Sequence, residues 1–196
     1  MSIGKRVSET IDKMEAGDPE GALFQICAAV EVTAKKECGR SGGPSYKEFL
    51  HSNLGLITDI AFGFKILNLN LTYNHSKLPT DSQGTAGIQD ILYHVVRCGL
   101  YHEASLPGDL QFVEKSQIRS ENGVLFLPSS LIYGLISAVV VAPVNAGEHA
   151  PKEGAMNFGD FPILINKLWG RRNELLWLLD ATNELAALRR AAERTS

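Results

Sequence analysis

The chain has 196 residues, of which 44% are hydrophobic, a length and composition that favour one domain with its own buried core. Its formal net charge of -3 and its pI near 6.0 exclude the strongly basic surface that binds duplex DNA tightly through counterion release. We therefore expect residues 1–196 to form a single domain, for which contact with RNA stays open.

The cysteines and the apolar runs indicate where in the cell the protein is expected. Cys27, Cys38 and Cys98 are odd in number and form no CxxC pair, so the sequence predicts neither a disulfide framework nor a zinc site. The strongest apolar run, residues 131–144, is shorter than the roughly 20 residues that cross a bilayer. We expect a cytoplasmic protein without a membrane segment, whose cysteines are reduced and buried.

Two amphipathic helices are expected in the first third of the chain. Asp18, followed by proline, is a favourable N-cap, and apolar residues then recur at three-and-four spacing up to Gly39. Ser45 and Glu48 form a capping box, which predicts a second helix running to Gly63. Because a short loop joins these two helices, we expect them to pack antiparallel.

The middle of the chain has a mixed pattern. Residues 65–74 alternate apolar and polar side chains, which indicates a strand, and a loop follows. A helical pattern returns over residues 88–100. Asn122 and Gly123 lie between two runs of strand character in residues 110–128, a pattern typical of a β-hairpin.

The last third is predicted to contain two more helices. One begins at Ser129 or Ser130, and a long glycine-rich connection then spans residues 143–159. Asp160 and Pro162 open the final helix. The sum is a mostly α domain, an antiparallel helical bundle with one small β-hairpin.

Arg97 and His102 are the candidate chemical pair. The sequence has no Walker phosphate loop, no dinucleotide-binding glycine motif and no HExxH motif, so no cofactor and no metal ion are expected. On a regular α-helix the two residues lie about 140° apart. Either His102 lies at the edge of the core and Arg97 is a solvent charge, or the helix loosens at Gly99 and both side chains turn toward one cleft.

Three stretches carry a family resemblance. The runs AGDPEGALFQICAAVEVTAKKE, YKEFL and ILYHVVRCGLYHEASLPGDL together resemble the HEPN superfamily of helical domains. The signature of that superfamily is an arginine, four to six residues and then a histidine, which Arg97 and His102 match with four residues between them. The resemblance covers most of the chain. It implies a helical bundle that dimerises and, in many members, a metal-independent endoribonuclease of toxin or phage-defence systems.

The resemblance also implies roles for single residues. RNA cleavage without metal needs a base for the ribose 2′-hydroxyl, an acid for the leaving 5′-oxygen and a cation for the phosphorane. Arg97 would bind the phosphate, and His102, one from each chain of a homodimer, would supply the base and the acid. Glu103 either orients the imidazole or only ends the helix surface. Tyr93 either stacks on a base of the RNA or packs in the core.

Two departures from the family pattern keep several hypotheses in place. Cys98 stands where active members often carry asparagine, and Ala104 stands where members neutralised by nucleotide transfer carry tyrosine. The leading hypothesis is an endoribonuclease acting on RNA as a homodimer, with an antitoxin or another protein as partner. The alternative is a catalytically inactive HEPN-like module that dimerises or binds a nucleotide or protein. A third hypothesis is an all-α protein that is unrelated to HEPN domains. It predicts that Arg97 and His102 lie on opposite faces of a helix, more than about 10 Å apart.

Overall fold

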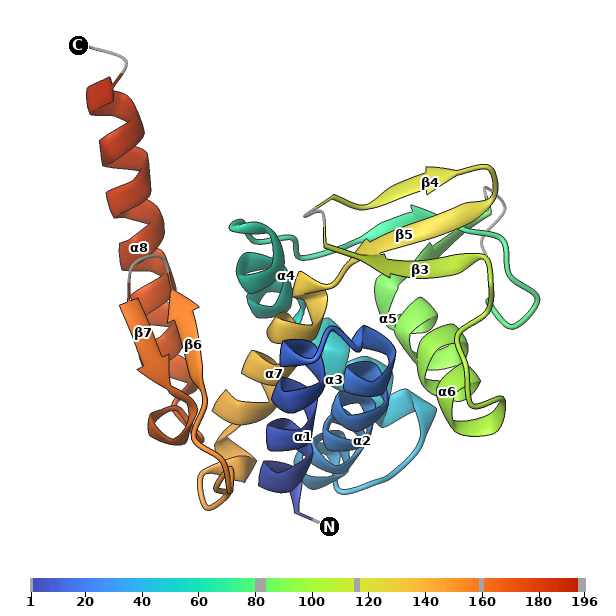
Figure 1. Cartoon of the computed structure of the whole chain (residues 1–196), viewed down its shortest axis with the longest axis horizontal. Helices are drawn as coiled ribbons and strands as arrows, with labels where there is room; N and C mark the ends of the chain where they lie inside the picture. Colours follow the sequence, from blue (N-terminus) through green and yellow to red (C-terminus); the bar gives the residue numbers. More distant parts are fainter. Residues whose placement is uncertain (1, 80–83, 115–116, 159–160, 194–196) are drawn as a thin grey trace.

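A helical body carries a small three-stranded sheet on one side and a hairpin with a long C-terminal helix on the other (Figure 1). The computed structural model describes residues 2–79, 84–114, 117–158 and 161–193. Helices dominate these residues, so the expectation of a mostly α protein is confirmed.

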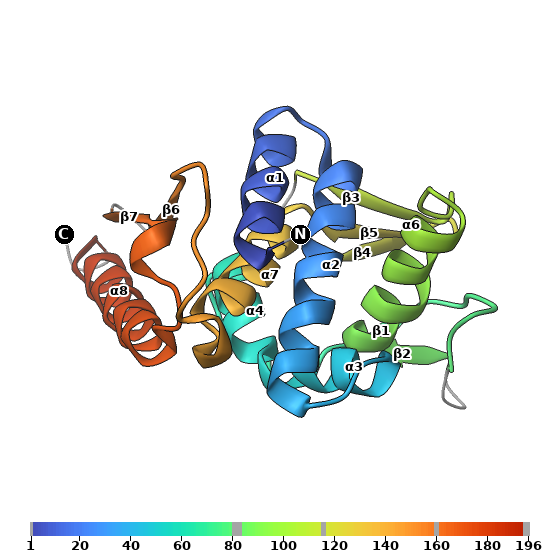
Figure 2. The same ribbon diagram turned by 90° about the horizontal axis from the view of Figure 1, so that it is seen from below.

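Helices α1 (Ile3–Glu15) and α2 (Pro19–Cys38) lie side by side in both views (Figures 1 and 2). The predicted caps of α2 are confirmed, because the Asp18 carboxylate accepts a hydrogen bond from the Gly21 N–H at 2.8 Å and Gly39 is left-handed at φ 67°. Helix α1 is absent from the sequence prediction. Its N-terminus is capped by the Ser2 hydroxyl, which accepts a hydrogen bond from the Lys5 N–H.

The predicted capping box at Ser45 and Glu48 is wrong. Helix α3 (Gly43–Ser52) already begins two residues before Ser45, and the buried Ser45 hydroxyl has no hydrogen-bond partner among the described residues. Pro44 lies in the first turn, where its fixed φ favours an early helix start.

The predicted second helix is also interrupted in its middle. Asn53 separates α3 from α4 (Leu54–Phe62), and its side-chain amide donates to the Phe49 carbonyl at 2.8 Å, where it closes the end of α3. Helix α4 ends at Gly63 with φ 78°, as the sequence predicts.

The strand expected over residues 65–74 contracts to β1 (Asn70–Thr72), which pairs antiparallel with β2 (Thr85–Gly87). After β2 comes one continuous helical stretch, made of α5 (Ile88–Asp90), a π-helix η1 (Ile91–Arg97) and α6 (Cys98–His102). The predicted helix is therefore confirmed in place, but its central turns are wider than α-helical turns.

The three-stranded sheet has the order β3 (Leu110–Val113), β5 (Val124–Pro128), β4 (Arg119–Glu121). The predicted hairpin joins β4 to β5, with Asn122 and Gly123 both at positive φ, 52° and 78°, as a type I′ turn requires. Strand β3 pairs with β5 in parallel, which the sequence pattern did not indicate.

Helix α7 (Ser130–Val141) is the predicted apolar helix and lies at the centre of the core. It crosses α4 so closely that a Cβ on Gly134 would lie 2.4 Å from the carbonyl oxygen of Ile57. Only glycine allows the two backbones this approach. A short 3₁₀ turn, η2 (Pro143–Asn145), follows.

The C-terminal part differs most from the prediction. The final helix does not open at Pro162, because Pro162 lies in β7 (Phe161–Leu164), which pairs antiparallel with β6 (Ala155–Phe158); Asp160 lies outside the described residues. Strand β6 also falls inside the predicted connection over residues 143–159. A 3₁₀ turn, η3 (Ile165–Lys167), and Gly170 at φ 73° precede α8 (Arg172–Glu193), so the helix cannot start earlier.

Candidate functional site

The helical stretch that carries Arg97 and His102 runs along the right of Figure 1. Its π-helical turns end at Arg97, where the Cys98 N–H donates to the Tyr93 carbonyl five residues earlier. Single π turns inside α-helices often mark functional sites. Gly99 itself lies within regular α6, so the loosening at Gly99 that one of the two alternatives requires does not occur.

Arg97 is held by a carboxylate on the neighbouring helix α2. Both its Nη2 and its Nε donate to Glu31 Oε2, at 2.8 and 3.3 Å. The Arg97 side chain is only 16% exposed. The opposite charge of Glu31 therefore neutralises the guanidinium within the fold.

Two tyrosine rings flank the same guanidinium. Arg97 Cζ lies 4.9 Å from the ring centroid of Tyr101 and 5.7 Å from that of Tyr93, within cation–π range. Partial burial acts against the charged form, but the hydrogen bonds to Glu31 and Cys98 outweigh it and raise the pKa of Arg97. The guanidinium thus contacts a carboxylate, a thiol and two aromatic rings of the same chain.

The Cys27 thiol and the Tyr46 hydroxyl are buried near Arg97. Burial raises the pKa of the Cys27 thiol to about 11, with smaller effects from Tyr46, Arg97 and Glu31. Burial likewise raises the pKa of the Tyr46 hydroxyl. Cys98 Sγ lies 3.9 Å from Arg97 Nη1. The expectation of buried cysteines is confirmed for Cys27, whereas Cys38 and Cys98 are only partly buried; all three are free thiols, as predicted.

Tyr93 packs against other groups of the protein. Its ring lies 5.3 Å from that of Tyr46 and 4.9 Å from that of His94, and it covers Gly43, where a Cβ would come within 2.7 Å of the ring. These contacts join the π-helical turns to the start of α3. The stacking of Tyr93 on an RNA base therefore stays a prediction.

His102 and Glu103 lie at the exposed end of α6. The Glu103 carboxylate pairs with Lys77, whose hydrogen bond and charge lower the pKa of Glu103, with smaller effects from His75 and His102. Over the described ranges, no hydrogen bond or ion pair joins Arg97 to His102. Neither sequence alternative fits in full, because His102 is exposed and Arg97 is the partly buried member of the pair.

A hollow lies beside this helix end. It has a volume of about 320 Å³ and is lined by Asp18, Glu20, Gly21, Phe24, Leu100 and Ala104. Ala104 has a strained φ of 57°. Among its lining residues Asp18 is paired with Lys13 at 2.9 Å, and no lining residue is a cation that could bind a phosphate. Within the part of the chain that the structure describes, no group of His, Cys, Asp and Glu side chains could hold a metal ion.

The sequence prediction missed Glu31 and Tyr101, which hold Arg97. Glu31 offered one signal, since it is a single charged residue within the apolar run AAVEVTA of α2. A lone acid on an otherwise apolar stretch needs a partner when that stretch is packed. Its distance of 66 residues from Arg97 in the sequence gave no sign of which cation that partner is.

Comparisons with known proteins place the chain in a family. A family model described as Rv1289 matches residues 2–190. The chain belongs to the Rv1289 family. Rv1289 of Mycobacterium tuberculosis (strain ATCC 25618 / H37Rv) and Mb1320 of Mycobacterium bovis are each 26% identical to it over 179 residues, which cover 87% of this chain and 84% of the relative. Both are described as uncharacterized proteins.

No solved structure matches this Rv1289 family chain. In the ranges 2–79, 84–114, 117–158 and 161–193, no helix is long and apolar enough to cross a membrane. The fold and the contacts of Arg97 and His102 therefore carry the functional argument.

Proposed function

We propose that this member of the Rv1289 family is a catalytically inactive helical module that works by binding a protein partner. The observation that carries the proposal is the Arg97 guanidinium, which Glu31 neutralises and two tyrosine rings flank. A phosphate would have to displace a charge-assisted hydrogen bond of 2.8 Å to reach it. Arg97 then serves to join the π-helical turns to α2.

The surroundings of His102 support the same proposal. His102 is exposed, and the hollow beside its helix end carries Asp18 and Glu20. An acid–base histidine needs a substrate proton within hydrogen-bond reach in a cleft that holds the substrate. The proposal includes a relation to HEPN domains, which the spacing of Arg97 and His102 supports. The free cysteines suit a reducing compartment, so we place the module in the cytoplasm.

The test is RNA cleavage with labelled single-stranded and transfer RNAs in excess EDTA. Wild type, Arg97→Ala, His102→Ala and the control Arg119→Ala are compared, since Arg119 also stacks on a ring, Phe126, at 4.3 Å. We expect none of the four to cleave RNA. Cleavage by wild type and Arg119→Ala alone, leaving 2′,3′-cyclic phosphate ends, would refute the proposal.

A second candidate function is the metal-independent endoribonuclease, acting on RNA as a homodimer and restrained by an antitoxin or another protein. The exposed position of His102, one turn beyond π-helical turns of the kind found at functional sites, favours it. In this candidate Glu31 restrains Arg97 until substrate binds. Glu31→Gln would then increase RNA cleavage, whereas the binding module predicts no cleavage by this variant either.

A further inference from the structure

We propose that the groove between β7 and α8 binds an amphiphile with one apolar chain and one anionic head, of the class of free long-chain carboxylates. This inference goes beyond the proposed function, because it concerns a small molecule and a site that contains neither Arg97 nor His102. The apolar lining of the groove and two cations at its rim carry the inference.

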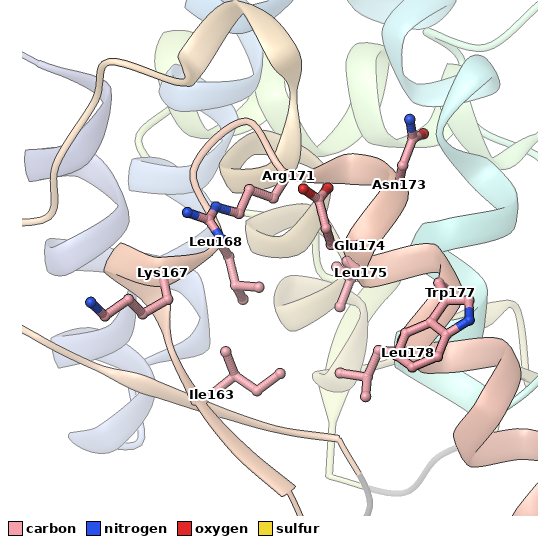
Figure 3. A pocket seen from close by; sticks show the side chains of 9 residues that line it. All are labelled: Ile163, Lys167, Leu168, Arg171, Asn173, Glu174, Leu175, Trp177 and Leu178. Atoms are coloured by element: carbon pink, nitrogen blue, oxygen red, sulfur yellow. The ribbon is translucent and has the colours of Figure 1, made fainter.

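The groove has the size and the lining of a small-molecule site. Its volume is about 580 Å³, within the roughly 300–1,000 Å³ of ligand pockets in proteins. The apolar residues that line it are Ile163, Leu168, Leu175, Trp177 and Leu178. In Figure 3 the side chains of Ile163, Leu168 and Leu175 turn toward a common space. A hydrocarbon chain in this space would remove apolar surface from water.

The groove has a buried floor and an exposed rim. Leu175 and Leu168 line it although they are only 1% and 5% exposed, so they form its floor. Trp177 is 73% exposed and lies at the rim. A bilayer surface would contact the rim and leave the floor uncovered, whereas a single chain contacts both. The structure therefore favours a free molecule over a lipid that stays in a membrane.

The charges at the rim define the head group. Lys167 and Arg171 line the groove and lie on the side opposite Trp177 (Figure 3). In the part of the chain that the structure describes, neither of these side chains forms a hydrogen bond or an ion pair. Glu174 also lines the groove, but it pairs with neither cation, and two positive charges exceed its one negative charge. An anionic head would thus meet two unpaired cations.

Unpaired cations are rare elsewhere in this chain. Ion pairs with carboxylates hold most of the described Lys and Arg side chains. Among the side chains that the structure describes, the Lys and Arg residues without an ion pair are Lys35, Lys167, Arg171 and Arg172. Three of them lie within residues 167–172 of a chain whose formal net charge is -3. Cations that gather in this way on an acidic protein indicate an anionic ligand.

The same lining favours a hydrocarbon chain over a peptide. Between the rim cations and Trp177 the lining consists of isoleucine and leucine side chains, which form no hydrogen bonds. A bound peptide brings backbone N–H and C=O groups, which need partners once water is displaced. A carboxylate at the end of a hydrocarbon chain needs partners only at the rim, where the Arg171 guanidinium offers a planar fork and Lys167 a point charge.

Tryptophan fluorescence of the full chain, titrated with dodecanoate below its micellar concentration, tests the site. The chain has two tryptophans, and Trp169 is buried with its indole N–H donated to Asn166 at 2.9 Å, so Trp177 reports on the groove. We expect a saturable shift of the emission to shorter wavelength. Dodecyltrimethylammonium, with the same chain and the opposite charge, should bind at least ~10-fold more weakly.

Three outcomes of this titration would overturn the proposal. The first is no saturable shift with dodecanoate, and the second is equal affinity for the anionic and the cationic amphiphile. The third is a shift with vesicles of anionic phospholipid but none with free dodecanoate, which would assign the groove to a membrane surface.

The double variant Lys167→Gln with Arg171→Gln tests the contacts of the head group. We expect its Kd for dodecanoate, measured by isothermal titration calorimetry, to rise ~10-fold, because both cations are lost. The matched control is Lys35→Gln, which removes an exposed, unpaired cation in the last turn of α2 and should bind as wild type does. An unchanged Kd in the double variant, with its fold intact by circular dichroism, would contradict the proposal.

Discussion

The seam between α2 and the π-helical turns and the outer face of α8 both combine aromatic and charged residues, but their contacts differ. In the seam Arg97 meets Glu31 at 2.8 Å and two tyrosine rings, and its side chain is 16% exposed. On α8 the Trp177 side chain is 73% exposed beside an open groove. Arg97 of the catalytic motif is thus already held by groups of the fold, whereas Trp177, in a region without such a motif, is exposed to solvent. Function is better sought where the fold leaves contacts unmade.

The largest expected effect is a difference in the free energy of unfolding between a substitution in the helical core and one on the exposed face of α8. Leu131 of α7 is fully buried, so Leu131→Ala should lower the free energy of unfolding by about 2–5 kcal/mol. Leu185→Ala, at a position that is 50% exposed, should change it by no more than about 0.5 kcal/mol. Urea denaturation of both variants measures this. Equal losses would mean that α8 belongs to the core.

The next effect tests whether Arg97 is structural. Arg97→Met leaves the Glu31 carboxylate partly buried without its cation, and we expect a loss of about 1–3 kcal/mol in the free energy of unfolding. In the double variant with Glu31→Gln, part of this loss should be absent, because the two groups act on each other. Urea denaturation of the four proteins completes the cycle. Strictly additive losses would show that the pair contributes nothing to the fold.

Thiol labelling distinguishes the interior of the seam from its edge. Burial raises the pKa of Cys27 to about 11, so its reactive thiolate is scarce at neutral pH and closed to solvent. Iodoacetamide should label Cys38 and Cys98 in the native protein and all three cysteines in urea. Peptide mass spectrometry identifies the labelled sites. Rapid native labelling of Cys27 would mean that the seam opens.

The smallest effect concerns pH. Desolvation lowers the pKa of His94 and the charge of Lys47 adds to this, while Asp90 opposes both. The folded state therefore binds this proton less readily than the unfolded state does, and the contribution of neutral His94 to stability is lost as pH falls below about 6.5. His94→Gln should flatten the unfolding free energy between pH 6.5 and 5. An unchanged slope would remove His94 from the account.

Local sequence signals predicted the elements that local chemistry determines. Asp18 and Gly39 cap α2, and Asn122 with Gly123 forms the hairpin turn. These signals are local, because each residue affects only backbone groups a few positions away in the sequence. The start of α3 was misplaced because Pro44 fixes the first turn before Ser45 can cap it. The parallel pairing of β3 with β5 depends on contacts across the sheet and left no periodic signal.

The candidate site shows the same limit. The spacing of Arg97 and His102 was visible in the sequence, but the partner of Arg97 lies on α2, 66 residues away. The π-helical turns were also not predictable, since residues 88–100 have the periodicity of an ordinary helix. A final helix was predicted, but only the structure shows that its Leu175 and Leu179 are buried whereas Trp177 and Leu185 are exposed.

Hydrogen–deuterium exchange of the full chain, with or without excess single-stranded RNA, tests the central claim most directly. Because Glu31 and two tyrosine rings already hold Arg97, we expect exchange over residues 88–103 to be unchanged by RNA. Slower exchange over residues 88–103 with RNA in wild type, but not in Arg97→Ala, would contradict the account and return function to Arg97 and His102.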